Sequence, residues 1–199
     1  MIKKDKHKGE TAYIIGKGKS LIHFNRSNIG DGVVIAIAES IVPIEALEIP
    51  AYSLQKDGGW LKRYPASLDP ACDSRDCDNC RGMVRPQKAI LLVHDLEARY
   101  CFKDYSPRHV FTLEEIGQPH NEFSLVCAIK IAQLMGCEKF KFVSCDAHAV
   151  GDYDVYVPGL GINTTPGWHG IEMRNLKMQR ELIKPYLEGT DYEWITPKG

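Results

Sequence analysis

Glycine and ionisable residues that follow apolar runs are the features of this sequence best suited to chemistry. The first group comes directly after the apolar run Thr11 to Ile15 and consists of Gly16, Lys17, Gly18, Lys19 and Ser20. Glycines at such a place let backbone N–H groups approach a phosphate, and a following helix adds its dipole. The segment therefore predicts a phosphate-binding loop, with a tight strand-to-helix turn as the alternative.

This glycine segment matches neither of two familiar nucleotide-binding motifs. The dinucleotide fingerprint needs glycine at its sixth position, which is Leu21 here. A P-loop ending at Ser20 needs an upstream glycine at position 13, which is Tyr13. If the segment binds a phosphate, it therefore does so through neither of these two motifs.

Polar residues also follow the other apolar runs. If these runs are parallel strands, their carboxyl ends meet at one edge of the sheet, where ligands bind in such folds. We expect the following residues to join the glycine segment in binding a nucleotide or phosphate: Glu39, Gln55, Asp57, His94 and Asp95.

Asp146, His148 and His169 are the candidates for catalysis. Asp146 ends the apolar run that begins at Lys139, and His148 lies two residues further on. A carboxylate close to an imidazole can serve a metal, a ribose or a proton transfer. A capping aspartate and a solvated histidine are the alternative. His169 precedes the last expected helix, whose N-terminus would face the same cleft, and is a further candidate base.

A cysteine cluster lies in the polar middle of the chain. Cys72, Cys77 and Cys80 fall within nine residues and include one C-x₂-C pair, which fits zinc geometry. Cys101 or His94 would supply a fourth ligand. Such a zinc ion would be structural and would hold a segment poor in apolar residues. A surface loop of free cysteines is the alternative.

The overall composition limits the class of protein. A chain of 199 residues with 44% hydrophobic residues favours one domain over residues 1–199, with an irregular cysteine-containing insertion over 56–88. A net charge of -1 removes the simplest argument for a general nucleic-acid binder, and the partner we expect is a small-molecule nucleotide ligand. The odd count of seven cysteines, without a signal-like segment, predicts free thiols and a cytoplasmic protein.

The periodicity predicts the elements that position these residues. Helices are expected over 39–47, interrupted by Pro43, over 124–135, ended by Gly136, and over 171–187, with a loop over 147–170. Strands are expected over residues 11–15, 33–38, 51–55, 89–94, 109–113, 139–145 and 192–195, the last an edge strand. Continuous apolar strands alternating with helices predict an α/β, Rossmann-like, doubly wound and mostly parallel sheet.

Two blocks of the sequence resemble a known family. The segments Tyr13 to Leu21 and Val34 to Ala38, and the later block Ser124 to Asp146, are similar to the sialyltransferase-like Rossmann-like group. This group includes bacterial sialyltransferases, motility-accessory glycosyltransferases and archaeal hydroxymethylpterin pyrophosphokinases. The chain departs from the group's pattern at Lys19, where proline is usual, at Glu39, and at Ser144, which begins the segment in place of G-x-D.

The resemblance implies that Gly16, Gly18 and Ser20 contact a nucleotide phosphate, with Asp146 close to the ligand. His148 or His169 would then activate an acceptor hydroxyl in transfer from a nucleotide sugar. The first alternative is a pyrophosphokinase that holds Mg²⁺ through Asp57, Asp95 and Asp146. The second is a nucleotide-binding domain without catalysis.

Overall fold

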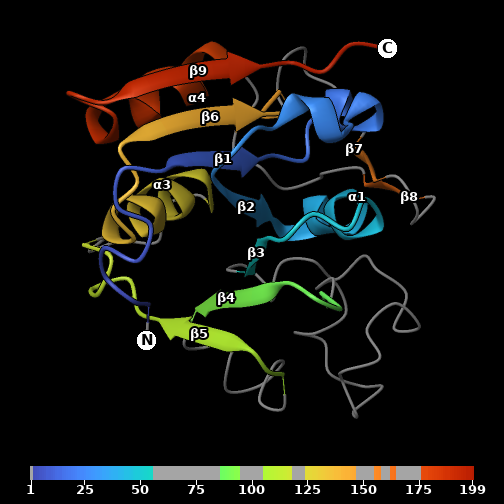
Figure 1. The fold of residues 1–199 in the computed structure, drawn as a ribbon. Helices are drawn as coiled ribbons and strands as arrows, with labels where there is room; N and C mark the ends of the chain where they lie inside the picture. Colours follow the sequence, from blue (N-terminus) through green and yellow to red (C-terminus); the bar gives the residue numbers. More distant parts are fainter. Residues whose placement is uncertain are drawn as a thin grey trace.

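The computed structural model of the chain describes residues 2–55, 86–94, 105–117, 124–146, 155–157, 162–164 and 176–199. The predicted cysteine-containing insertion falls almost entirely outside these ranges. The main sheet contains β1 (Thr11–Ile15), β2 (Val33–Ile37), β3 (Tyr52–Gln55), β4 (Ile90–His94), β5 (Arg108–Phe111), β6 (Lys139–Val143) and β9 (Asp191–Ile195). Its order is β5-β4-β3-β2-β1-β6-β9, and every neighbouring pair is parallel (Figure 1).

The strand order gives the sheet a switch point between β1 and β6. From β1 the chain adds β2, β3, β4 and β5 in turn on one side, then returns to add β6 and β9 on the other. Ile15 of β1 pairs with Val143 of β6, so the two strands end level with each other. The fold is therefore α/β and Rossmann-like, with a parallel sheet, as the sequence predicts.

Helices cover both faces of this sheet. On one face lie α3 (Ser124–Leu134) and α4 (Leu176–Ile183), with η7 (Lys184–Tyr186) after α4. Side chains of α3 and η7 pack there with alternate residues of the strands, Ile14, Ile35 and Phe142 among them. The other face carries η1 (Lys19–His23) and α1 (Ile41–Ala46); η2 (Arg26–Asn28) follows η1, and η3 (Ala38–Ser40) follows β2. Leu21 and Ile44 pack on that face against Ile15 and Ala36.

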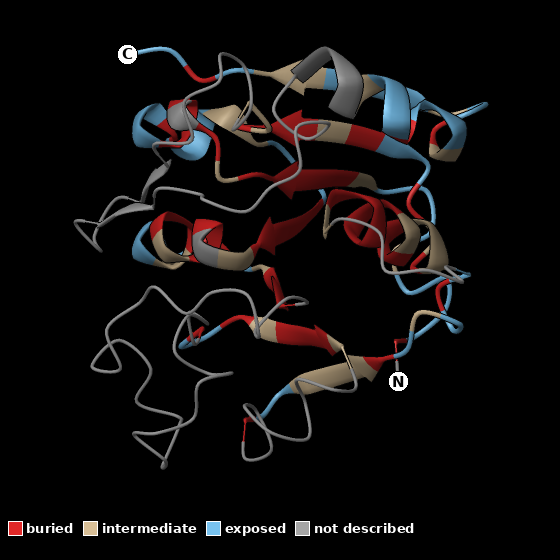
Figure 2. Cartoon of the chain, turned by 180° about the vertical axis from the view of Figure 1, so that it is seen from behind, coloured by how far each residue is buried: buried red, intermediate tan, exposed pale blue. Residues whose placement is uncertain are grey.

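Burial follows this layered arrangement. The residues of β2 and β3 are buried on both faces, whereas β9 at one edge is exposed to intermediate (Figure 2). Strands buried on both faces explain why their sequences read as continuous apolar runs. No helix in the described part of the chain is long and apolar enough to span a membrane.

Two expectations need correction. Pro43 does not interrupt a helix, because it lies in the first turn of α1, where the missing N–H has no partner to lose. The segment 147–170 is not wholly a loop, since β7 (Val155–Val157) and β8 (Ile162–Thr164) form an antiparallel pair. Strand β7 contacts η1, which follows β1.

The N-terminal segment fixes the end of α3. The N–H groups of Asp5, His7 and Gly9 donate to the carbonyls of Leu134, Met135 and Gly136 at 3.1, 2.7 and 2.9 Å. These carbonyls at the end of a helix have no partner within it. Gly136 has φ of +89°, so the predicted glycine stop of this helix is confirmed.

Candidate functional site

The candidate site lies where the chain leaves β1 and β6, at the switch point of the sheet. Gly16 follows Ile15, and Ser144 to Asp146 follow Val143. In open α/β sheets the crevice at such a switch point is where ligands bind, because the two chains turn away to opposite faces. Here the two segments contact each other directly, and their contacts define the geometry of the site.

Gly16 provides the room for that contact. A Cβ atom at this residue would lie 2.6 Å from the Ser144 carbonyl oxygen, 2.8 Å from Cys145 Cα and 2.9 Å from Cys145 Sγ. Two of these atoms belong to the backbone and cannot move independently. Gly16 is therefore needed for the close approach of the two strand ends.

The backbone N–H groups of the glycine segment bind the protein itself. Gly16 N–H donates to the carbonyl of Val143, and Gly18 N–H donates to that of Ser144, both at 2.8 Å. In this structure these two donors join the ends of β1 and β6. A phosphate at the loop would need other donors, or a shift of the segment after β6.

Ser20 and Asp146 complete the connection. Ser20 Oγ donates to Asp146 Oδ1 at 2.8 Å, and Ser20 N–H donates to Asp146 Oδ2 at 3.3 Å. The carboxylate thus lies at the start of η1, where the amide groups favour a negative charge. Ser20 is buried, whereas Asp146 is half-buried, so the carboxylate remains at the surface of the site.

The ends of β2 and β3 extend this edge. Ser40 Oγ lies 2.9 Å from the carbonyl oxygens of both Ile15 and Ile37, and so bridges β1 and β2. Gln55, almost fully buried, donates to the Ala38 carbonyl at 3.2 Å and to Ser53 Oγ at 3.0 Å. Gln55 therefore supports the turn after β2, a structural contact that its place at a strand end does not reveal.

Cys145 is half-buried within the site and is unsuited to nucleophilic attack. Its thiol donates to the carbonyls of Ile14 and Val143 at 3.6 Å each. Burial raises the pKa of the Cys145 thiol to about 12, and the charge of Asp146 adds to this. Since the thiolate is the reactive form, Cys145 is unreactive at neutral pH.

Some of the other predicted site residues lie at this edge of the sheet, and the rest lie outside the described residues. His94 ends β4 at the same edge, half-buried, with its ring 5.8 Å from that of Phe111. Lys17 and Lys19 lie in the glycine segment, and Glu39 lies in η3 after β2. These positions lie outside the described residues: Asp57, Asp95, His148, His169, Cys72, Cys77, Cys80 and Cys101.

The described residues contain no group of three histidine, cysteine, aspartate or glutamate side chains that could hold a metal ion. All four cysteines of the predicted zinc site lie outside the described residues, as do two of the three aspartates considered for magnesium. Both metal sites therefore stay predictions from the sequence.

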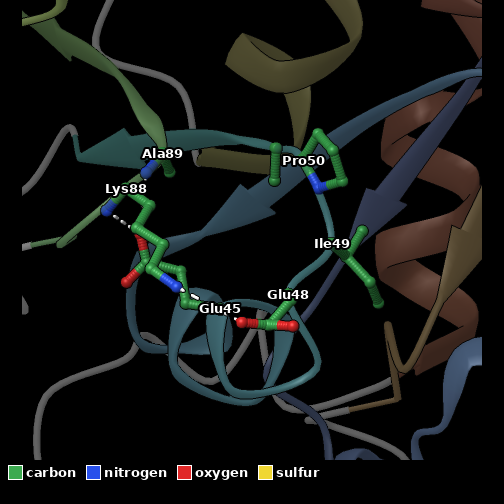
Figure 3. Close-up of a pocket in the computed structure, with 7 residues that line it drawn as sticks. Glu45, Glu48, Ile49, Pro50, Lys88 and Ala89 are labelled. Atoms are coloured by element: carbon green, nitrogen blue, oxygen red, sulfur yellow. Dashed lines mark hydrogen bonds and ion pairs between the residues drawn. The ribbon is translucent and has the colours of Figure 1, made fainter.

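A pocket of about 260 Å³ lies at the opposite edge of the sheet, by the starts of β3 and β4 (Figure 3). Glu45 occupies one side of it and accepts hydrogen bonds from three successive backbone N–H groups, those of Gln87, Lys88 and Ala89, at 2.7–2.9 Å. These three backbone N–H groups are already hydrogen-bonded to the Glu45 carboxylate. The pocket therefore has a structural role here, in joining α1 to β4.

No protein-family model matches this sequence, and no curated protein matches it either. Among solved structures, the chain is similar to the sialyltransferase CstII from Campylobacter jejuni in complex with cytidine-5'-monophosphate, at 14% identity and a TM-score of 0.49. That alignment covers 96% of this chain and 82% of the other. A complex of CST-II with a trisaccharide acceptor and CMP gives 13% identity and a TM-score of 0.45, covering 96% and 82%. The fold class stated above follows from this chain's own strand order and does not depend on these likenesses.

Sequence reasoning did not identify three residues of this edge. Ser144 has a left-handed backbone with φ of +52°, and its fully buried hydroxyl has no hydrogen-bond partner in the described part of the chain. Arg180 stacks on Trp194 of the neighbouring strand β9, with 4.5 Å between Cζ and the ring centroid. Arg180 falls within the expected last helix and Trp194 within the expected edge strand, but nothing in their spacing brings them together.

Proposed function

We propose that the chain is a nucleotide-binding transferase that uses a nucleotide sugar as donor. The observation that carries the proposal is the contact across the switch point, in which Ser20 and Asp146 join the loop after β1 to the end of β6. A crevice at this place in a parallel α/β sheet is the usual site for a nucleotide. The sequence resemblance of both contacting segments to sialyltransferase-like proteins supports the choice of a nucleotide sugar.

Asp146 has two roles in this proposal. It fixes the glycine segment through Ser20, so the loop is preorganised before ligand arrives. Among the described residues, its Oδ2 atom accepts only the longer bond of 3.3 Å, which leaves capacity for a hydroxyl group of the ligand. Asp146 thus binds and orients, and the proton transfer falls to His148 or His169, the two histidines named by the sequence.

The glycosyl transfer itself requires little of the protein. A base removes the proton from the acceptor hydroxyl, and positive or hydrogen-bonding groups stabilise the phosphate that leaves. The bond from the anomeric carbon to the phosphate oxygen breaks as the bond to the acceptor oxygen forms. The nucleotide leaves with the phosphate, and its product is the ligand most readily tested.

Thermal unfolding with CMP, UDP, GDP and ATP, each with and without Mg²⁺, tests the proposal. We expect a pyrimidine nucleotide to raise the melting temperature without magnesium. A ligand at 100 times its dissociation constant adds about 2.7 kcal/mol to the free energy of unfolding, which is easily detected. A shift that needs ATP and Mg²⁺ together would favour the pyrophosphokinase instead, and no shift with any nucleotide would reject both enzymes.

A variant separates specific binding from general stabilisation. Asp146→Ala removes the carboxylate and should reduce the nucleotide-dependent shift. Glu181→Ala removes an exposed carboxylate that pairs with Lys184 nearby, at 2.8 Å, and should leave the shift unchanged. Equal loss in both variants would show that the effect of nucleotide does not come from the switch point.

A further inference from the structure

Two side-chain polar atoms near one corner of the sheet are buried without a hydrogen-bond partner. In the described part of the chain these are Ser144, through Oγ, and Arg180, through Nε. The large majority of buried side-chain polar atoms in proteins have a hydrogen-bond partner, so each exception needs a reason. Ser144 follows β6, and Arg180 stacks against β9, the strand next to it. The first therefore follows β6 and the second lies on α4 against the neighbouring strand β9, both beside the switch point.

Arg180 is held in place by aromatic rings. Its guanidinium carbon lies 4.5 Å from the ring centroid of Trp194. Trp194 stacks in turn on Phe142 of β6, with 4.6 Å between centroids and 28° between planes. Trp194 and Phe142 are also paired in the sheet register. The guanidinium is thus fixed by stacking, which leaves its in-plane N–H groups for another partner.

No hydrogen bond or ion pair with a residue of the described ranges engages the Arg180 guanidinium, and Nε is among the unpartnered atoms. Arginine at a purely structural position normally uses its fork of donors on a carboxylate or carbonyl. The side chain is half-buried, so its charge is only partly solvated. Such a cation is suited to binding an anionic ligand.

The charge of Arg180 acts on the switch point. It lowers the pKa of the Cys145 thiol, against the larger raising effect of burial, while Asp146 raises it. Cys145 Sγ also lies 2.9 Å from where a Cβ on Gly16 would be. The charge of Arg180 therefore reaches the thiol that contacts the glycine segment, and the arginine itself lies on α4.

The strain at Ser144 is consistent with a binding role. Its N–H donates to the Ile195 carbonyl at 3.1 Å, and its carbonyl accepts from Gly18 at 2.8 Å, so its backbone is fixed from both sides. A left-handed backbone in a residue other than glycine costs on the order of 1–2 kcal/mol, and such strain gathers at ligand sites. Here the strain coincides with an unsatisfied hydroxyl.

We propose that Arg180 is the phosphate-binding residue of this site and that it takes a phosphate group of the ligand at the carboxyl ends of β6 and β9. The planar guanidinium binds two phosphate oxygens at once, and the Trp194 ring below it keeps that orientation. The loop N–H groups of Gly16 and Gly18 then need not bind phosphate, because they hold β6. The nucleotide nature of the ligand rests on the proposed function, whereas the phosphate-binding role of Arg180 does not.

The experiment compares ligands with and without phosphate. Dissociation constants are measured by calorimetry for CMP against cytidine and UDP against uridine, and thermal shifts are measured with inorganic phosphate and pyrophosphate. The variants are Arg180→Gln, which removes the charge, Arg180→Lys, which keeps it without the fork, and Lys184→Gln as the control. Lys184 is an exposed cation one helical turn along the chain and pairs with Glu181.

We expect Arg180→Gln to reduce the affinity gained from the phosphate by about 10- to 100-fold, in line with loss of a charged hydrogen bond. Nucleoside binding should be unchanged. Arg180→Lys should lose less, and Lys184→Gln should keep the wild-type ratio. The unliganded melting temperature of each variant shows whether loss of the stack on Trp194 has unfolded the protein, and Arg180→Lys keeps a cation beside the ring without the planar stack.

Three further outcomes are decisive. If Arg180→Gln keeps the full phosphate gain, the proposal is wrong and Arg180 only covers Trp194. If pyrophosphate stabilises the wild type through Arg180 while no nucleotide binds, the phosphate site stands and the proposed function fails. If neither nucleotides nor inorganic phosphates bind the wild type, both proposals are rejected.

Discussion

Ser20 and Asp146 lie 126 positions apart in the chain, yet Ser20 Oγ donates to Asp146 Oδ1 at 2.8 Å. This contact closes the switch point of the sheet and should have a measurable coupling energy. Because the acceptor is a charged group in a partly buried place, we expect about 1–2 kcal/mol of coupling in a double-mutant cycle of Ser20→Ala and Asp146→Ala. Urea unfolding of the four proteins gives the value.

The control for this cycle is Ser27→Ala. Ser27 is exposed and bonds to Asn25, two residues away. Its loss should change the free energy of unfolding by less than about 0.5 kcal/mol. Additive effects of Ser20→Ala and Asp146→Ala would show that the two side chains do not interact in solution.

Gly16→Ala should be strongly destabilising. The new methyl group would lie 2.6 Å from the Ser144 carbonyl oxygen, which belongs to the backbone of the segment after β6. Overpacking of this kind costs about 1–3 kcal/mol, measured by urea unfolding. Gly117→Ala is the comparison, because Gly117 has open space around it and only its φ of +70° opposes a side chain. A smaller loss at Gly16 than at Gly117 would contradict the close approach.

Glu45→Gln should destabilise the protein by about 1–3 kcal/mol, because the carboxylate accepts from three successive backbone N–H groups of residues 87–89. An amide nitrogen in place of one oxygen would oppose those donors (Figure 3). Glu48→Gln provides a matched control in the same pocket. Glu48 makes an exposed ion pair of 3.6 Å with Lys88, which is worth less than about 1 kcal/mol. Equal losses in the free energy of unfolding for Glu45→Gln and Glu48→Gln would contradict this expected difference.

Alkaline pH should destabilise the fold through its buried thiols. Burial raises the pKa of Cys145 to about 12 and that of Cys137 to about 11, from an ordinary value of 9.0. Above pH 9 the unfolded chain loses protons that the folded chain keeps, so the free energy of unfolding falls from pH 9 to about pH 12. Below pH 9 neither thiol adds any dependence.

Cys145→Ala and Cys137→Ala test this in chemical unfolding across pH 8 to 11. Other groups titrate in this range, so the informative quantity is the difference in slope between each variant and the wild type. Each variant should show a shallower fall than the wild type. Identical slopes in the wild type and both variants would mean that the thiols ionise as easily in the folded protein as in the unfolded chain.

The fold was predictable because its signals are local. Continuous apolar runs such as Val33 to Ile37 are typical of a covered parallel sheet, and the structure has that sheet. For the site, only its location was predictable, at the edge of the sheet where the parallel strands end. The strand ends place Ser20 and Asp146 together, but the pairing of Gly16 and Gly18 with β6 depends on contacts between residues more than 120 positions apart. The stack of Arg180 on Trp194 is of the same long-range kind, and periodicity carries no information about it.

Glycine substitutions should distinguish strain that serves binding from strain that serves only the fold. Ala38 and Ser144 directly follow β2 and β6 with φ of +50° and +52°. Such a backbone costs about 1–2 kcal/mol without glycine, while glycine's freedom in the unfolded chain takes back about 0.4–1 kcal/mol. Ala38→Gly and Ser144→Gly should each raise the free energy of unfolding by up to about 1 kcal/mol. Ser144→Gly should gain more, because it also removes an unsatisfied hydroxyl.

If the hydroxyl binds ligand beside Arg180, Ser144→Gly should also weaken the thermal shift with pyrophosphate, whereas Ala38→Gly should not. A more stable Ser144→Gly protein with an undiminished shift would restrict phosphate binding to Arg180 alone.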